Sequence, residues 1–268
     1  MVRRLVLEKR RVNTRESCGV TLFTIRDIES HFDETLSQAY KQIKLAEELS
    51  IKGLTEESEG ILRLQIVLVE SAYDYYLHEL LRWGVVKIFT GEWEGKGKQY
   101  QELELPLRVF ELAMKNNNNY DWLKEWVTEK YSHLTLMDYP QLKYVCGLLG
   151  LNIRDVAELA FYKVGSQDKS EYELERQIRE TYRRRNQIVH QSDRKTGTAE
   201  RENINRDYVE GRIMCIRKVV LALCEVARRK DRQEQNAKKV GSWMIDLRAK
   251  LIGILMVRMN KLATNCYV

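Results

Sequence analysis

Hydrophobic and polar positions along most of the chain follow a helical repeat. Apolar residues recur at spacings of three and four over long segments, and almost no stretch shows the residue-by-residue alternation of a half-buried strand. Only two prolines interrupt 268 residues, so long helices are free of their strongest breaker. The pattern predicts an all-α protein.

In the first half of the chain, the repeat predicts a helix at 25–50 and a longer one at 56–89. Gly53 marks the break between them, and Thr55 is the expected N-cap of the second. Loops are expected at 90–99 and 116–119, on either side of a first amphipathic piece at 101–115; a second follows at 120–132. The second helix carries one apolar stripe, which predicts a core or a subunit seam: Leu62, Ile66, Val69, Tyr73, Tyr76, Leu80 and Trp83.

In the second half, "YPQLKYVCGLLGL" predicts a short helix that ends at Gly147 or Gly150, followed by a helix at 153–164. Ser170 and Glu173 have the spacing of a capping box, which predicts a helix start just before Glu171.

This helix contains "YRRRNQIVHQSDR" at 182–194. After a polar loop, Asn205 or Asp207 is expected to begin a helix through Val226, and a charged link with one more amphipathic helix follows from Arg228.

The amino-acid composition indicates the class of protein and the compartment in which it is expected. Hydrophobic residues make up 44% and charged residues 31%, which is typical of a soluble folded protein. No apolar run is long enough to span a bilayer, and the N-terminus lacks the apolar core of a signal peptide, so we expect a cytoplasmic protein without a membrane partner. Five irregularly spaced cysteines without a CxxC pair predict reduced thiols.

Positive charge is clustered although the net charge is only +6. Residues 176–195 carry seven Lys or Arg and two acids, and residues 228–239 carry six and two. Residues 1–19 form a basic N-terminal arm with six Lys or Arg in the first fifteen. Such clusters suit a polyanionic partner, although a basic surface also serves solubility.

The three adjacent arginines differ in position on a helical wheel that advances 100° per residue. Arg185 falls among Leu174, Ile178 and other apolar positions, whereas Arg183 falls on the opposite, solvent-facing side and Arg184 on the flank. A buried guanidinium needs a partner. Arg185 therefore predicts a buried Arg–carboxylate pair or a residue that faces a cleft or a subunit interface.

His190 lies five residues after Arg185, about 140° further round an ideal helix, so one chain does not easily aim both side chains at one point. Either the helix ends near Val189 and His190 turns back, or two copies of the segment meet. A lone histidine at a helix end is also a common cap or surface group. An Arg-Asn pair followed by His at this spacing is expected roughly 0.02 times by chance in such a chain.

The segment "RNQIVH", with Arg185, Asn186 and His190, resembles the R-x4–6-H motif of HEPN domains (higher eukaryotes and prokaryotes nucleotide-binding). The long second helix "LRLQIVLVESAYDYYLHELLR" and the "LGL" turn are similar to the branch named for the RiboL-PSP RNases. The resemblance covers about 20–227. It implies a HEPN-like helical bundle, here with an additional C-terminal segment at 228–268.

Active members of that family are metal-independent endoribonucleases that bring two motif copies together as homodimers, and other members are inactive binding modules. The resemblance makes Arg185 and His190 the catalytic pair and Asn186 a supporting residue. It implies RNA as substrate, no cofactor and no metal. A toxin or anti-phage role is common among such nucleases and implies an antitoxin or another regulatory protein.

The chemistry of RNA cleavage fits these residue types. Histidine titrates near neutrality and serves as general acid or base, while arginine presents a planar charged fork to phosphate oxygens. Asn186 would hydrogen-bond His190 or a phosphate; alternatively, it satisfies backbone carbonyls at a helix end. Arg179, Arg184 and Arg194 are expected to add phosphate contacts, or only general positive charge.

Other roles depend on which helix faces are buried. Glu70 and Asp74, one turn apart on the second helix, would orient the active-site arginine or form a solvated face. Tyr73 and Tyr182 would stack on bases or belong to the core. Two other functions remain open: a catalytically inactive helical module that binds RNA or protein, and, with less support, a DNA-binding protein.

Overall fold

The computed structural model describes residues 23–94, 97–115, 120–164, 169–195 and 197–264, with side chains up to Lys239. The basic arm at 1–19 and the side chains of the C-terminal segment from 240 onward lie outside the described residues, as does the loop at 116–119.

The fold is all-α, as predicted. The described ranges contain no named strand, and an isolated antiparallel bridge joins Arg194 and Arg201. The helices are α1 (Ile25–Ile51), α2 (Thr55–Phe89), α3 (Lys98–Gln101), α4 (Leu107–Lys115), α5 (Asp121–Tyr131), α6 (Tyr139–Leu149), α7 (Ile153–Phe161), α8 (Ser170–Gln191) and α9 (Arg206–Thr264).

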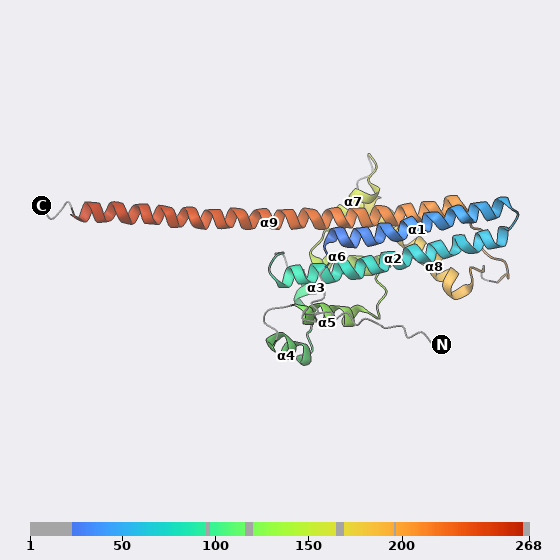
Figure 1. Ribbon diagram of the computed structural model, residues 1–268, viewed down its shortest axis with the longest axis horizontal. Helices are drawn as coiled ribbons and strands as arrows, with labels where there is room; N and C mark the ends of the chain where they lie inside the picture. Colours follow the sequence, from blue (N-terminus) through green and yellow to red (C-terminus); the bar gives the residue numbers. More distant parts are fainter. Residues whose placement is uncertain (1–22, 95–96, 116–119, 165–168, 196, 265–268) are drawn as a thin grey trace, which may run out of the picture.

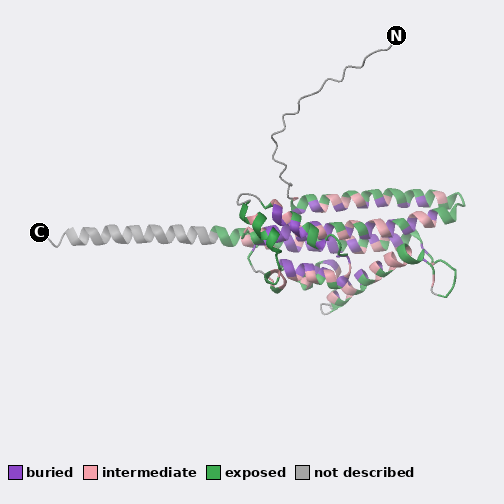
Figure 2. Cartoon of the chain, turned by 90° about the horizontal axis from the view of Figure 1, so that it is seen from below, coloured by how far each residue is buried: buried purple, intermediate pink, exposed green. Residues whose placement is uncertain are grey.

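Helix α2 is the centre of the body. It packs against α1, α5, α6, α8 and α9, and Figure 1 shows α1 and the first part of α9 running beside it. All seven residues of its predicted apolar stripe are buried, including Tyr73, Tyr76 and Leu80, which are fully so. Buried positions line the inner faces of the long helices in Figure 2. Hydrophobic burial along this stripe therefore organises the core.

Local sequence explains several helix ends. Thr24 caps α1 through a capping box with Asp27, in which each side chain accepts a hydrogen bond from the other residue's backbone. Asp138 caps α6. Gly150 ends α6 in the left-handed conformation, with φ of 63°, which a glycine adopts without a steric penalty. The end of this helix is thus at Gly150 and not at Gly147.

Two predicted caps are wrong. Thr55 is the first residue of α2 and its side chain caps nothing, because the break at Gly53 places Leu54 at the N-cap. At α8 the N-cap is Lys169, without a side-chain hydrogen bond. Ser170 Oγ is buried without a partner, and Glu173 pairs with Arg176 instead.

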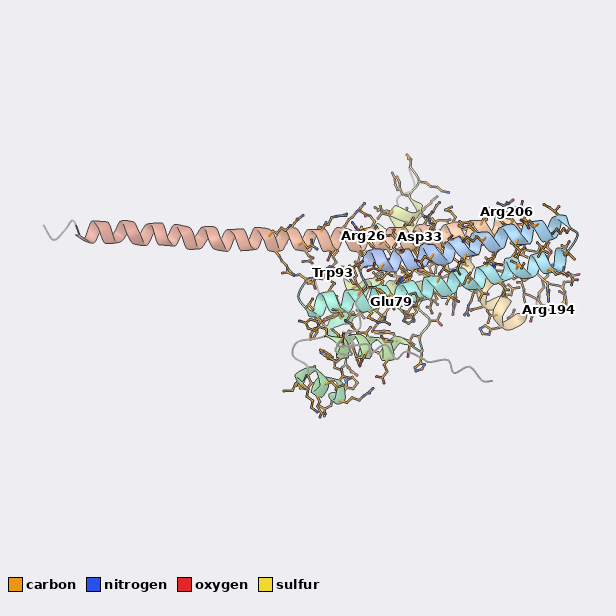
Figure 3. All side chains as sticks on the ribbon, viewed as in Figure 1. Arg26, Asp33, Glu79, Trp93, Arg194 and Arg206 are labelled. Atoms are coloured by element: carbon orange, nitrogen blue, oxygen red, sulfur yellow. The ribbon has the colours of Figure 1, made fainter. Side chains whose placement is uncertain are left out.

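The charged link predicted to follow from Arg228 is also wrong, because α9 continues through this region as helix. Its charges hold it against the body. Lys230 Nζ donates to the carbonyl oxygens of Leu149 and Gly150 at 3.0 and 3.3 Å, and Trp93 Nε1 donates to Asp231 Oδ1 at 2.9 Å. Figure 3 places Trp93 beside α9, at the end of the body away from Arg194. Polar contacts therefore hold this part of α9 against the body.

Two further findings concern membrane-spanning helices and cysteines. Among the described residues, no helix combines the length and apolar character needed to cross a membrane. Cys146, Cys215 and Cys224 are free thiols, and Cys146 and Cys224 are buried. Cys18 and Cys266 lie outside the described residues.

Candidate functional site

Helix α8 carries the residues that sequence singled out. Its inner face holds Leu174, Ile178 and Thr181 in the core, against α2, α7 and α9. Its outer face begins with ion pairs one turn apart, such as Arg179 Nε to Glu175 Oε1 at 2.7 Å, which support an exposed helix. The apolar repeat therefore fixes which residues of α8 face away from the core.

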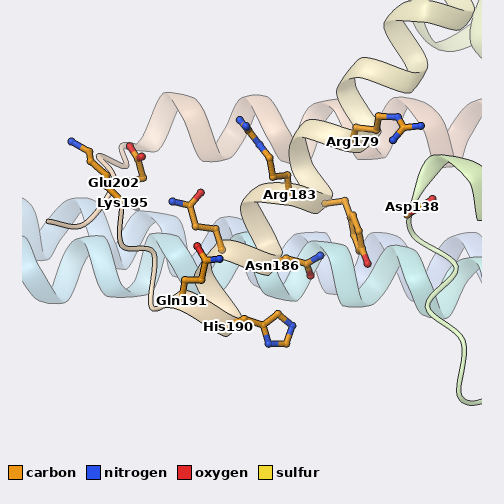
Figure 4. Close-up of a pocket in the computed structure, with 10 residues that line it drawn as sticks. Asp138, Arg179, Arg183, Asn186, His190, Gln191, Lys195 and Glu202 are labelled. Carbon is orange, nitrogen blue, oxygen red and sulfur yellow. The ribbon is translucent and has the colours of Figure 1, made fainter. Parts of the chain in front are cut away.

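A groove of about 780 Å³ runs along this outer face. Figure 4 shows the α8 residues between Asp138 on one side and Lys195 and Glu202 on the other. Cations, amides, an aromatic ring and two acids line it: Asp138, Arg179, Tyr182, Arg183, Asn186, Gln187, His190, Gln191, Lys195 and Glu202. This mixture suits a phosphate-bearing ligand that also presents hydrogen-bonding groups.

Four of the lining residues form one face of the helix, the groove face: Arg179, Arg183, Asn186 and His190. Their successive spacings of four, three and four keep them within an arc of about 60°. Arg183 is exposed, as predicted. Its guanidinium makes no hydrogen bond or ion pair within the described part of the chain, so it is free to meet an anion. The wheel assigned it only to solvent and did not show that the solvent side of α8 is a groove.

Arg185 lies on the other side of the helix. It is half-buried and does not line the groove. Its Nη1 donates to Asn186 Oδ1 at 2.9 Å, and its Nε is buried without a partner. No hydrogen bond or ion pair between Arg185 and His190 occurs among residues 169–195. Helix α8 continues to Gln191, so the possibility that it ends near Val189 and lets His190 turn back is wrong.

Glu70 on α2 interacts electrostatically with Arg185. The side chain is buried, and both carboxylate oxygens lack a hydrogen-bond partner. Burial raises the pKa of Glu70 to about 8, although the positive charge of Arg185 acts in the opposite direction. The hydroxyl of the fully buried Tyr73 is likewise unpaired, and burial raises its pKa. Buried polar atoms of Glu70, Tyr73 and Arg185 that lack hydrogen-bond partners thus lie on the core side of the motif.

Asp74 has a different environment from Glu70. Its Oδ1 accepts a hydrogen bond from the backbone N–H of Leu136 at 2.7 Å, and its Oδ2 is 3.9 Å from His78 Nε2. Asp74 therefore holds the segment that precedes α6. Of the two predicted supporting carboxylates, the structure brings Glu70 into the field of Arg185, while it engages Asp74 elsewhere.

Of the three arginines expected to contact phosphate, only Arg179 lines the groove. Arg184 Nη2 donates to Asp193 Oδ2 at 2.8 Å, and its guanidinium lies 5.7 Å from the ring centre of Tyr208. Arg194 is exposed in the loop between α8 and α9, where its Nη1 donates to the carbonyl oxygen of Ala199. The structure thus gives Arg184 a structural contact and places Arg194 outside the groove.

Sequence reasoning missed the groove residues that come from other segments. Asp138 is the N-cap of α6, and Lys195 and Glu202 belong to the loop after α8. In the sequence, Lys195 counts only as part of the basic cluster at 176–195, and no local pattern connects Asp138 or Glu202 with α8, because tertiary packing brings them there. Tyr182 packs partly against the core, as one of its two predicted roles requires, and it also lines the groove, where base stacking stays a prediction.

In the part of the chain that the structure describes, no group of three or more His, Cys, Asp or Glu side chains is arranged to hold a metal ion. Comparisons of the chain with models of known protein families, with curated proteins and with solved structures found no match.

Proposed function

We propose that this protein is a metal-independent endoribonuclease of the HEPN type that acts as a homodimer in the cytoplasm. The observation that carries the proposal is the groove face of α8, where Asn186 and His190 of the R-N-x3-H motif stand in line with Arg179 and Arg183. A row of cations, an amide and an imidazole matches a sugar-phosphate backbone.

In the proposed reaction, the 2′-oxygen of the RNA attacks the adjacent phosphorus and the bond from phosphorus to the 5′-oxygen breaks. One His190 takes the proton of the 2′-OH, and the His190 of the partner subunit gives a proton to the departing 5′-oxygen. Arg185 stabilises the charge on the phosphate oxygens in the transition state. The products are a 2′,3′-cyclic phosphate and a 5′-OH end.

The dimer is part of the proposal because of the angle between Arg185 and His190. Within one chain, His190 faces the groove, and Arg185 lies on the side of α8 that faces Glu70. Two copies of α8 that meet near Asn186 would bring two His190 imidazoles to one phosphate, and each Arg185 would reach that phosphate at the edge of the groove face, where its Nη1 contacts Asn186. A nuclease of this kind also needs restraint, so we include an antitoxin or regulatory partner and a role in toxicity or defence against phage.

The test is cleavage of a defined single-stranded RNA by the purified protein in EDTA. We expect cuts that end in 2′,3′-cyclic phosphate, and we expect Arg185→Ala and His190→Ala to abolish them while both variants remain folded. Cuts that end in 3′-OH, or equal activity in the variants, would show that the proposal is wrong.

A second function, a catalytically inactive helical module that binds RNA, is favoured by the absence of a contact between Arg185 and His190 in the described groove. It predicts that the wild-type protein binds RNA without product and that a single subunit suffices. Sedimentation of the protein with and without RNA, together with the cleavage assay, separates the two functions.

A further inference from the structure

The chain reverses direction directly after His190 in an uncommon way. Ser192 and Asp193, with φ of 51° and 60°, are successive non-glycine residues in the left-handed region. The backbone N–H groups of both donate to the carbonyl oxygen of Gln187. Glycine is the residue that usually ends a helix in this conformation, because other side chains are disfavoured there. Aspartate tolerates this conformation better than most other side chains, so the contacts of its carboxylate, and not the turn, distinguish Asp193.

The Asp193 carboxylate is fully buried between two arginines, which we call the Asp193 triad: Arg63 of α2, Asp193 and Arg184 of α8. Oδ2 accepts from Arg63 Nε at 2.7 Å and from Arg184 Nη2 at 2.8 Å. The side chains of Arg63 and Arg184 are only 7% and 11% exposed. Burying three charges is unfavourable unless each is held by several good contacts.

The same arginines also hold the returning end of the loop. Arg63 Nη2 donates to the carbonyl oxygen of Glu202 at 2.9 Å, and Arg184 Nη2 donates to that of Asn203 at 3.2 Å. The backbone N–H of Glu202 donates to the carbonyl oxygen of Asp193 at 2.8 Å. The triad thus ties α2, the last turns of α8 and both ends of the loop at one point.

The tied segments are the ones that complete the groove. Lys195 and Glu202, at the two ends of this loop, form one side of it, and His190 lies in the last turn of α8, three residues before Asp193. We propose that Asp193 is a positioning residue, which fixes His190 and the Lys195 side of the groove relative to the rest of α8. This proposal rests on the proposed function, because the groove is taken as the site of RNA cleavage.

The alternative is that the triad only stabilises the fold. The chain offers a matched control in another ion pair between helices, that of Glu29 on α1 with Arg228 on α9. Neither residue lines the groove. A variant of this pair loses an interhelical contact without touching the end of α8.

The test compares Asp193→Asn with Glu29→Gln in the full chain. Asparagine keeps the shape of aspartate and tolerates the left-handed conformation, so this change removes the negative charge and one acceptor oxygen while one oxygen can still accept from the arginines. The chain has four histidines, so the imidazole resonances of His190 are assigned by comparison with His190→Gln. Both variants and the wild type are then measured by NMR, by thermal unfolding and by RNA cleavage.

We expect Asp193→Asn to shift or broaden the His190 imidazole resonances and to lower kcat by about tenfold or more with little change in KM, as misplacement of a reacting group does. We expect Glu29→Gln to change only Tm. If Asp193→Asn also changes only Tm, the positioning role is wrong.

Two other outcomes also decide whether Asp193 has a positioning role. If Asp193→Asn does not fold, Arg63→Lys replaces it, because lysine keeps the charge but lacks the fork that reaches Asp193 and Glu202 together; the same readouts apply. If the wild-type protein cuts no RNA, the proposed function fails, and the His190 resonances alone decide the positioning role.

Discussion

Arg185 Nη1 donates a 2.9 Å hydrogen bond to Asn186 Oδ1, so two neighbours on α8 that face different directions are joined at their tips. Arg185 lies in the field of the buried Glu70 on α2, while Asn186 shares the groove face with His190. The bond therefore connects the buried side of the helix with the side open to a ligand. Through it, the Asn186 side chain fixes the position of the Arg185 guanidinium.

Replacement of Asn186 by Ala is expected to lower kcat/KM for RNA cleavage by about tenfold, which corresponds to about 1.4 kcal/mol. The reason is that Arg185 loses the acceptor that fixes its Nη1. Gln187→Ala is the matched control, because Gln187 is a neighbouring amide that lines the same groove without contacting Arg185. An equal loss in both variants would contradict a specific role for Asn186.

The adjacent Arg183 and Arg184 are expected to separate binding from stability. Arg183→Ala removes an exposed cation from the groove, so RNA affinity and its salt dependence fall, the slope by about one unit, without a change in Tm. Arg184→Ala breaks a contact of the Asp193 triad, so the free energy of unfolding falls by about 2 kcal/mol. Binding titrations at several salt concentrations and thermal melts test the pair; the opposite assignment would contradict the structure.

Glu70→Gln is expected to stabilise the protein more at pH 8 than at pH 5. The pKa of Glu70 is raised from 4.5 to about 8, so the folded state keeps a proton that the unfolded state has released over this interval. The stabilisation that goes with the neutral carboxyl is complete below about pH 4.5 and is lost as the pH rises through about 8, by up to about 1.4 kcal/mol per unit.

Glutamine cannot ionise, so the difference in free energy of unfolding between variant and wild type should grow with pH. Chemical denaturation at pH 5 and pH 8 measures it. A difference that is the same at both values would show that Glu70 is not desolvated as described.

The all-α class and the central helix were predictable because their cause is local. The three-and-four repeat of Leu62, Ile66 and Val69 continues to Trp83, and a stripe of that length is buried wherever the helix packs. The wheel also separated Arg183 from Arg185 correctly, since both positions depend only on helical geometry. The two wrong caps, at Thr55 and Ser170, show that a sequence match to a cap does not fix the register of the first turn.

The groove could be predicted only in part. Its α8 residues follow from the period of one helix, but Asp138, Lys195 and Glu202 arrive through tertiary packing. The Asp193 triad could not be predicted either, because Arg63 and Asp193 are 130 positions apart along the chain. No local sequence pattern indicates that Asp193 is buried. The predicted charged link failed for the same reason: its partners are distant.

Trp93 is expected to carry much of the contact between residues 228–239 of α9 and the body. Its ring packs edge-to-face on Trp83 with centroids 4.9 Å apart, and Lys230 Nζ lies 5.1 Å from its centre. Trp93→Ala should lower the free energy of unfolding by about 3 to 5 kcal/mol. Trp93→Phe keeps an aromatic ring but loses the hydrogen bond to Asp231, and should lower it by about 1 kcal/mol.

Denaturant unfolding of both Trp93 variants measures these values. Equal and small losses would show that the ring contributes little to holding residues 228–239 of α9 against the body.

The groove face of α8 has a consequence for how this gene can vary. Adding one residue between Asn186 and His190 would rotate the imidazole by about 100° out of line with Arg179 and Arg183, toward the flank that Arg184 occupies. Seven added residues would return it to within about 20°, but displaced by two turns from its neighbours. Insertions and deletions compatible with function should therefore fall in the loop between Lys195 and Glu202, and the number of residues between Arg179 and His190 should stay fixed.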